Sequence, residues 1–134
     1  METVSFNIPA VVCAALLYFV IGGLWYSPLL FSRSWQLACG LSDAQLQAAP
    51  KGRIFALSAI AALVIAFNLA AFIGAKSSIA FGLFAGGATG IGWVAMSLGV
   101  IYLFEQRPLK LWLINSGYQV VAYTLMGALL AGWK

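Results

Sequence analysis

Four long apolar runs without a charged side chain dominate the sequence. They cover residues 8–31, 54–74, 79–104 and 111–133, and none contains Asp, Glu, Lys, Arg or His. Each is long enough to cross the roughly 30 Å hydrocarbon core of a bilayer as a helix, which takes about 20 residues. The sequence therefore predicts an all-α integral membrane protein with four transmembrane helices, the fourth starting near residue 109.

The rest of the chain is too short for a soluble domain. Charged residues make up only 7% of the 134 residues, whereas soluble domains carry about 25%. We therefore expect a single membrane domain over residues 1–134. The first run is longer than the apolar region of a signal peptide and follows no basic segment, so we expect a retained span.

The basic residues predict the orientation. Five of the seven Lys and Arg residues lie in the loops 32–53 and 105–110, and only Lys76 and Lys134 lie on the opposite side. Because positive loops stay in the cytoplasm, we expect both termini outside the cytoplasm; a dual orientation is the alternative. The charges flank the spans and form no patch, which favours membrane lipids over nucleic acid as partners.

The first loop contains the signature of a short helix. Ser42 and Gln45 have the spacing of a capping box, and Pro50 ends the segment. We expect a short interfacial helix in this cytoplasmic loop, with Trp35 and Leu37 nearby as anchors.

Capping residues mark the ends of the spans. Asn7 can cap the first helix and Pro28 should end or kink it. Gly74 suits a helix C-terminus, the pair 77–78 can cap the third helix, and Pro108 suits the first position of the fourth. Such short connections predict an antiparallel four-helix bundle.

The third run has glycines on one helical face. Gly82, Gly86 and Gly90 are four residues apart, and small residues let two membrane helices approach closely. We interpret this face as a helix-packing surface, within the bundle or in a homo-oligomer. A substrate groove lined by backbone is the alternative.

The second and fourth runs contain polar residues. Asn115, Gln119 and Tyr123 form one stripe that should face inward. Counting residues places Asn68 near Tyr123 and Trp93 near Gln119, so we expect an Asn68–Tyr123 hydrogen bond. Such residues can either hold helices together or line a small-molecule site. The candidate polar and aromatic pocket comprises Trp25, Tyr26, Asn68, Trp93, Asn115, Tyr118, Gln119 and Tyr123.

Catalytic and ion-coupling groups are scarce. Glu105, Arg107 and Lys110 lie at the end of a span, where an interface ion pair is expected, and the uncharged runs offer no carboxylate for proton coupling. The chain has no His, so Cys13 and Cys39 offer neither an ordinary zinc site nor a nucleophile with a base. We expect no metal, no cofactor and no enzyme activity.

Several segments resemble a family of small bacterial membrane proteins catalogued as domain of unknown function 1761. The resemblance covers Gly22–Phe31 with its Trp-Tyr-Ser-Pro motif, Trp35 and the pair 40–41, and then Tyr102–Asn115 with its Phe-Glu-x-Arg motif, continuing to residue 127. It implies a four-helix domain of unassigned activity, located in the bacterial inner membrane. The small multidrug resistance family is similar in architecture only, because the first run lacks that family's membrane-embedded glutamate.

Two functions remain open. The first is a non-enzymatic structural or accessory bundle, packed through the third span as a homo-oligomer or within a larger membrane complex. The second is a small carrier or binding protein for a neutral apolar or lipid-like molecule, since such a site needs aromatic walls and a few polar groups.

Overall fold

The computed structural model describes residues 6–74 and 77–133, and all regular structure in these ranges is helical. The elements are α1 (Ile8–Trp25), α2 (Ser32–Cys39), α3 (Asp43–Ala48), α4 (Lys51–Ile73), α5 (Ile79–Thr89), the π-helical segment η1 (Gly90–Ala95), α6 (Met96–Phe104) and α7 (Leu109–Gly132).

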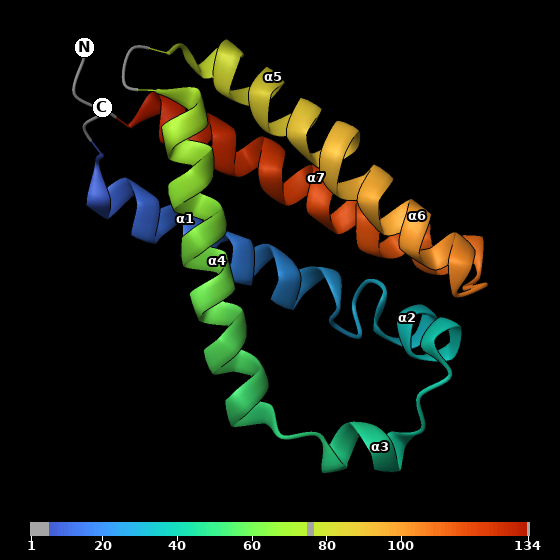
Figure 1. Ribbon diagram of the computed structural model, residues 1–134. Helices are drawn as coiled ribbons and strands as arrows, with labels where there is room; N and C mark the ends of the chain where they lie inside the picture. Colours follow the sequence, from blue (N-terminus) through green and yellow to red (C-terminus); the bar gives the residue numbers. More distant parts are fainter. Residues whose placement is uncertain (1–5, 75–76, 134) are drawn as a thin grey trace.

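Four helices are long and apolar enough to cross a membrane. They are α1, α4, the continuous helix α5–η1–α6 and α7. Figure 1 shows the start of α1 and the end of α7 at one end of the molecule, as expected for an even number of antiparallel spans. The Asn7 side chain donates a hydrogen bond of 3.3 Å from Nδ2 to the Trp133 carbonyl oxygen. The all-α, four-span architecture is thus confirmed.

The helix ends agree with the capping signals. The Asn7 side chain accepts from the Ala10 amide, Gly74 ends α4 with φ 79°, and Ser78 caps α5. The first helix is shorter than predicted because α1 ends at Trp25, ahead of Pro28, which disfavours helical backbone in the residue before it.

The first long loop holds one helix more than predicted. Ser42 and Gln45 form the expected capping box at the start of α3. The preceding residues, Trp35 and Leu37 among them, form α2, which ends at Gly40 in the left-handed conformation with φ 72°. The helix α2 packs against α7.

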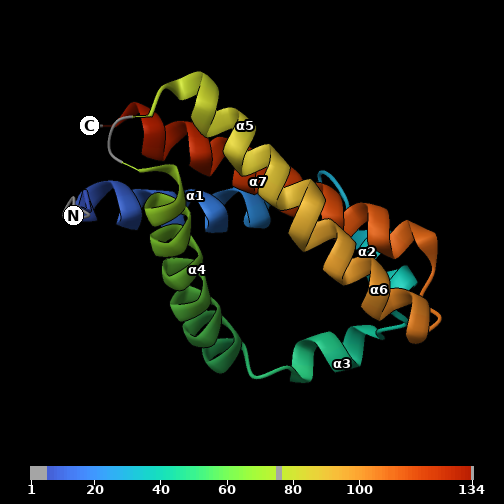
Figure 2. The same cartoon turned by 45° about the horizontal axis from the view of Figure 1, so that its top comes forward.

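The most extensive helix contact joins α5 to α7, which lie side by side in Figures 1 and 2. The glycine face makes this approach possible. A Cβ on Gly82 would collide with the backbone of Gly127, and one on Gly86 with the backbone of Tyr123. One on Gly90 would lie 2.9 Å from the Val120 Cα. Gly82, Gly86 and Gly90 therefore pack against α7 within the chain.

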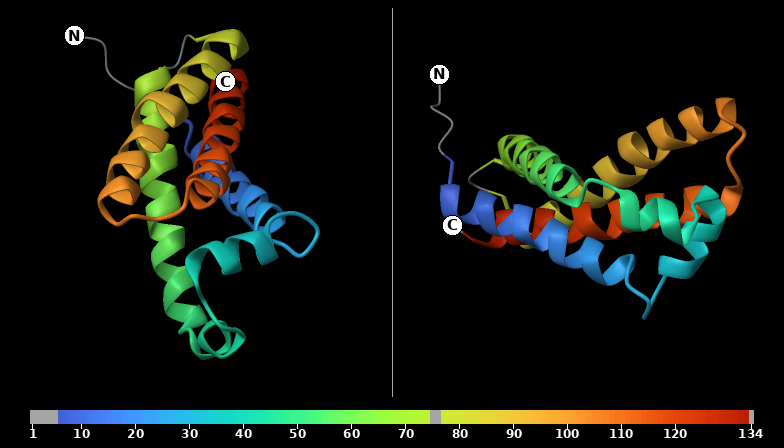
Figure 3. Two further views of the ribbon diagram at one scale, coloured as in Figure 1. Left: turned by 90° about the vertical axis from the view of Figure 1, so that its right-hand side faces the viewer. Right: turned by 90° about the horizontal axis from the view of Figure 1, so that it is seen from below.

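The helices α1 and α4 differ in how closely they pack against α7. The helix α1 packs against α7 and α4, and buried alanines such as Ala14, Ala62 and Ala66 lie at this crossing. The first part of α4, residues 51–57, is exposed throughout. In Figure 3, α4 accordingly diverges from the other long helices toward α3.

Candidate functional site

The structure divides the candidate pocket residues into two separate groups. Five of them lie between α1 and α7 and form what we call the α1–α7 polar cluster. The other three lie around a depression beside α4, which we call the α4 groove. The first group is Trp25, Tyr26, Asn115, Tyr118 and Gln119, and the second is Asn68, Trp93 and Tyr123.

Asn115 is the hub at one end of the polar cluster. Its Oδ1 accepts a 2.7 Å hydrogen bond from the Tyr26 hydroxyl, and its Nδ2 donates a 2.8 Å bond to the Tyr102 hydroxyl oxygen. Trp25 Nε1 donates to the Ile114 carbonyl oxygen at 2.9 Å. One amide of α7 thereby links the end of α1 to α6.

Tyr18 forms the central contacts of the polar cluster one to two turns away from Asn115 and Tyr26, and no sequence pattern singles it out. Its hydroxyl accepts from Gln119 Nε2 at 2.9 Å and lies 3.1 Å from Gln119 Oε1. The Tyr118 hydroxyl donates a 2.7 Å bond to the Tyr18 carbonyl oxygen. Tyr18 belongs to no polar repeat in the first span, so only the crossing of α1 and α7 reveals its role.

Two glycines make room for this cluster. A Cβ on Gly22 would lie 2.9 Å from the Tyr118 hydroxyl, and one on Gly117 would lie 3.0 Å from Trp25 Cζ2. The polar groups of the cluster are bonded to one another across tightly packed helices. This arrangement is well suited to hold α1, α6 and α7 together.

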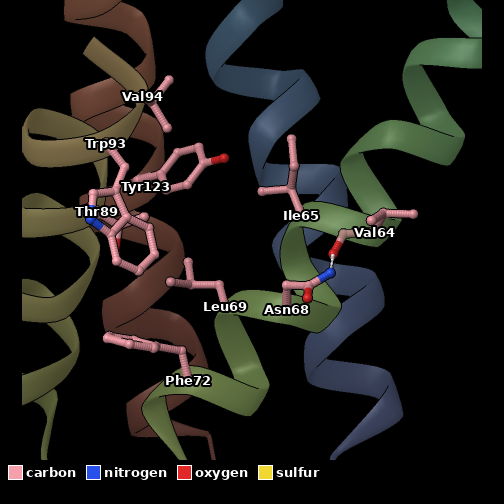
Figure 4. Close-up of a pocket in the computed structure, with 9 residues that line it drawn as sticks. All are labelled: Val64, Ile65, Asn68, Leu69, Phe72, Thr89, Trp93, Val94 and Tyr123. Atoms are coloured by element: carbon pink, nitrogen blue, oxygen red, sulfur yellow. Dashed lines mark hydrogen bonds between the residues drawn. The ribbon is translucent and has the colours of Figure 1, made fainter. Parts of the chain in front are cut away.

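The α4 groove is more open. It has a volume of about 370 Å³ and lies between α4, the third span and α7 (Figure 4). Its volume falls within the usual range of small-molecule sites, about 300–1,000 Å³. Its lining consists of Val64, Ile65, Asn68, Leu69, Phe72, Thr89, Trp93, Val94 and Tyr123.

Asn68 does not form the expected hydrogen bond with Tyr123, although both line this groove. Its Nδ2 donates instead to the Val64 carbonyl oxygen, one turn earlier in α4, at 2.8 Å. The expectation was wrong because residues at similar depth need not face each other, and an Asn side chain can bond to its own helix. Asn68 is an exposed residue.

Aromatic side chains form one wall of the groove. Trp93 is 63% exposed and meets Phe72 edge-on, with ring centroids 5.9 Å apart. Tyr123 is 9% exposed and lies deeper. A mostly apolar hollow with one amide at its rim suits a neutral molecule better than an ion.

Trp93 and Val94 reach the groove from the π-helical segment η1. Segments of this kind are rare and are frequent at functional sites. Trp112 Nε1 donates a 2.9 Å hydrogen bond to the carbonyl oxygen of Ala95, the last residue of η1. The glycines at 90 and 92 were the only sequence signal for such an irregularity.

The charged residues near the α6–α7 turn lie outside both sites. Arg107 Nε donates to Glu105 Oε1 at 3.2 Å, and Lys110 is exposed in the first turn of α7. Burial raises the pKa of the Cys39 thiol at the end of α2, and the positive charge of Arg107 partly opposes this shift.

Metal-binding and redox groups do not gather in the described ranges. No group of three or more His, Cys, Asp or Glu residues that could hold a metal ion occurs there, and Cys13 and Cys39 are free thiols. The buried Ser116 hydroxyl has no hydrogen-bond partner within residues 6–74 and 77–133.

Comparison with known proteins identifies the family. No curated protein and no solved structure gives a significant match. A family model described as "protein of unknown function (DUF1761)" matches residues 9–131, which is nearly the whole chain. The resemblance carried by the Trp-Tyr-Ser-Pro and Phe-Glu-x-Arg motifs is therefore confirmed, and the chain belongs to the DUF1761 family.

Proposed function

We propose that this protein is a non-enzymatic binding protein or carrier for a neutral, lipid-like molecule, which it holds in the α4 groove. The observation that carries the proposal is the lining of that groove. Apolar and aromatic side chains line the groove next to the exposed Asn68 amide, whose oxygen and second N–H form no hydrogen bond within the described part of the chain. A hydroxyl or ester of a ligand can pair with that amide while its apolar part lies on Trp93 and Phe72.

The groove is better suited to this role than the α1–α7 polar cluster. The cluster's side chains already bond to one another across closely packed helices. Displacing them would leave polar groups unpaired inside the membrane, which is costly. The groove offers a polar group and volume without breaking a contact between helices.

A neutral probe tests this proposal directly. The purified protein would be incubated in bilayer nanodiscs with a photoactivatable diacylglycerol, illuminated, and digested to map the labelled peptides. We expect labelling around Asn68 and Trp93. Asn68→Leu should lower it about five-fold, because one polar contact in a membrane protein contributes about 1 kcal/mol.

Phe104→Ala is the matched control for Trp93→Ala. Phe104 is 85% exposed and does not line the groove. We expect Trp93→Ala to reduce labelling and Phe104→Ala to leave it unchanged. Labelling spread evenly over all exposed apolar residues would contradict the proposal.

A structural or accessory role is the second candidate. Its supporting observation is the start of α4, where Ile54, Phe55 and Leu57 are 46%, 62% and 56% exposed and contact little of the chain. A helix of a second copy or of a larger complex could pack there. Native mass spectrometry in mild detergent tests it, and a strictly monomeric, partnerless protein would exclude it.

The proposed location is the bacterial inner membrane, with both termini outside. The support is the excess of Lys and Arg in the loops 32–53 and 105–110. A membrane-impermeant maleimide should label a cysteine placed at Ser77 in intact spheroplasts and should not label one placed at Ser42. The reverse pattern would invert the orientation, and labelling of both would indicate dual topology.

A further inference from the structure

A second groove lies between α6 and α7, away from the α4 groove. Its volume is about 440 Å³, and its lining includes Gly99, Val100, Tyr102, Leu103, Arg107 and Trp112. Val100 and Leu103 are 55% and 79% exposed, so its apolar wall faces the surroundings of the helix hairpin. Arg107 is the one charged residue of the lining, and it lies in the turn after α6.

The floor of this groove is fixed by bonds to its neighbours. The Trp112 indole donates to the Ala95 carbonyl oxygen and covers Gly99, where an added Cβ would lie 3.1 Å from Trp112 Nε1. The Tyr102 hydroxyl accepts from Asn115 Nδ2. The Trp112 and Tyr102 rings are already ordered before a ligand binds, which lowers the entropic cost of binding.

Only one nitrogen of the Arg107 guanidinium donates a hydrogen bond within the described residues. Its Nε donates to Glu105, and its guanidinium carbon lies 5.9 Å from the centroid of the Tyr102 ring. Its terminal Nη groups donate no hydrogen bond within residues 6–74 and 77–133, and the side chain is 41% exposed. The bond from Nε to Glu105 orients the guanidinium, and the two terminal Nη groups stay free to donate to a phosphate.

We propose that this groove binds an anionic phospholipid, with the phosphate on Arg107 and an acyl chain along Val100 and Leu103. Tyr102 and Trp112 lie one turn from the ends of their helices, where aromatic residues commonly meet lipid headgroups. The cation lies at the end of the apolar groove, as the headgroup of a lipid lies at the end of its acyl chain. This site is independent of the function proposed for the α4 groove.

Native mass spectrometry with phosphatidylglycerol and with phosphatidylcholine of the same acyl chains tests the site. Arg107→Gln should lower the preference for the anionic lipid about five-fold, since one cation near a membrane surface contributes about 1 kcal/mol. Glu105→Gln should raise the preference, because it removes an anion that competes for the guanidinium. Val100→Trp should fill the groove and weaken the binding of both lipids.

The controls separate this site from general surface charge and from free phosphate. Arg53, in the first turn of α4, is exposed and does not line the groove, so Arg53→Gln should retain the lipid preference. Asn68→Leu should also retain the lipid preference, whether or not the α4 groove binds a ligand. Circular dichroism of each variant checks the fold.

The proposal is overturned if Arg107→Gln keeps the preference for phosphatidylglycerol, or if Arg53→Gln lowers it equally. An unchanged Val100→Trp variant would also overturn it, because no chain would then lie in the groove. Displacement of the lipid by excess inorganic phosphate would show a headgroup-only anion site instead.

Discussion

Replacing Gly86 by alanine tests how closely α5 and α7 depend on the missing side chain. The Cβ of Gly86→Ala would lie 2.8 Å from the Tyr123 carbonyl carbon and 3.0 Å from the Thr124 Cα. Both are backbone atoms of α7, so neither can rotate away. Ordinary contact begins near 3.4 Å, and the Tyr123 carbonyl oxygen lies nearer still to the added Cβ, so the two helices must separate by more than about 0.6 Å.

The loss of stability caused by Gly86→Ala follows from that separation of the helices. A gap of about 0.5–1 Å forfeits a quarter to a half of each dispersion contact, and the same face also seats Gly82 and Gly90. Overpacking in a well-packed core costs about 1–3 kcal/mol. We expect Gly86→Ala to lower the free energy of unfolding by roughly 2 kcal/mol, although alanine alone favours helix by about 1 kcal/mol.

Gly23→Ala provides the matched control. Gly23 also lies within a helix, α1, but a Cβ there meets nothing within 4 Å. The assay is unfolding by increasing mole fractions of SDS, followed by far-UV circular dichroism. Equal stability of Gly86→Ala and Gly23→Ala would refute the argument that backbone approach holds α5 to α7.

Further experiments test the polar contacts and the thiol. Gln119→Leu removes the bonds to Tyr18 and should destabilise the protein by only about 0.6 kcal/mol, the average for such bonds in membranes; a loss above about 2 kcal/mol in the SDS assay would contradict this. Asn115→Leu breaks links to two helices and should cost more than Gln119→Leu in the same assay, so an equal or smaller cost would argue against its role as a hub. Because burial raises the pKa of Cys39, its alkylation by maleimide in a Cys13→Ala background should need a higher pH than that of a free thiol. Arg107→Gln should move that midpoint higher still, since the cation favours the thiolate; a downward shift would show that the sign is wrong.

Much of the fold was predictable because local signals were strong. The capping box of Ser42 and the C-terminal Gly74 depend on residues a few positions apart, and both lie where the sequence indicated. Pro28 correctly signalled the end of α1, although the helix stops earlier, at Trp25. The helix α2 was missed because it has no side-chain cap at its start. The π-helical segment η1 was not predicted, because it lies inside one uninterrupted apolar run whose pattern indicates a single continuous helix.

The candidate site was predicted less well, since its residues were grouped by depth alone. Depth along a span can be counted, but the direction in which a side chain points depends on how the helices cross. Asn68 illustrates the difference, because it lies in the same groove as Tyr123 and still bonds to its own helix.

The amino-acid sequence by itself determined the environment and the number of spans, because lipid excludes charge and every apolar run must satisfy its own backbone as a helix. It also determined that one face of the third span could approach another helix. The tertiary structure alone decided that this helix is α7 of the same chain and not a helix of a second copy. It also decided that Tyr18 joins the polar cluster and that Asn68 and Trp93 share an open groove. Those contacts join residues far apart in the chain, and only the angles at which the packed helices cross bring them together.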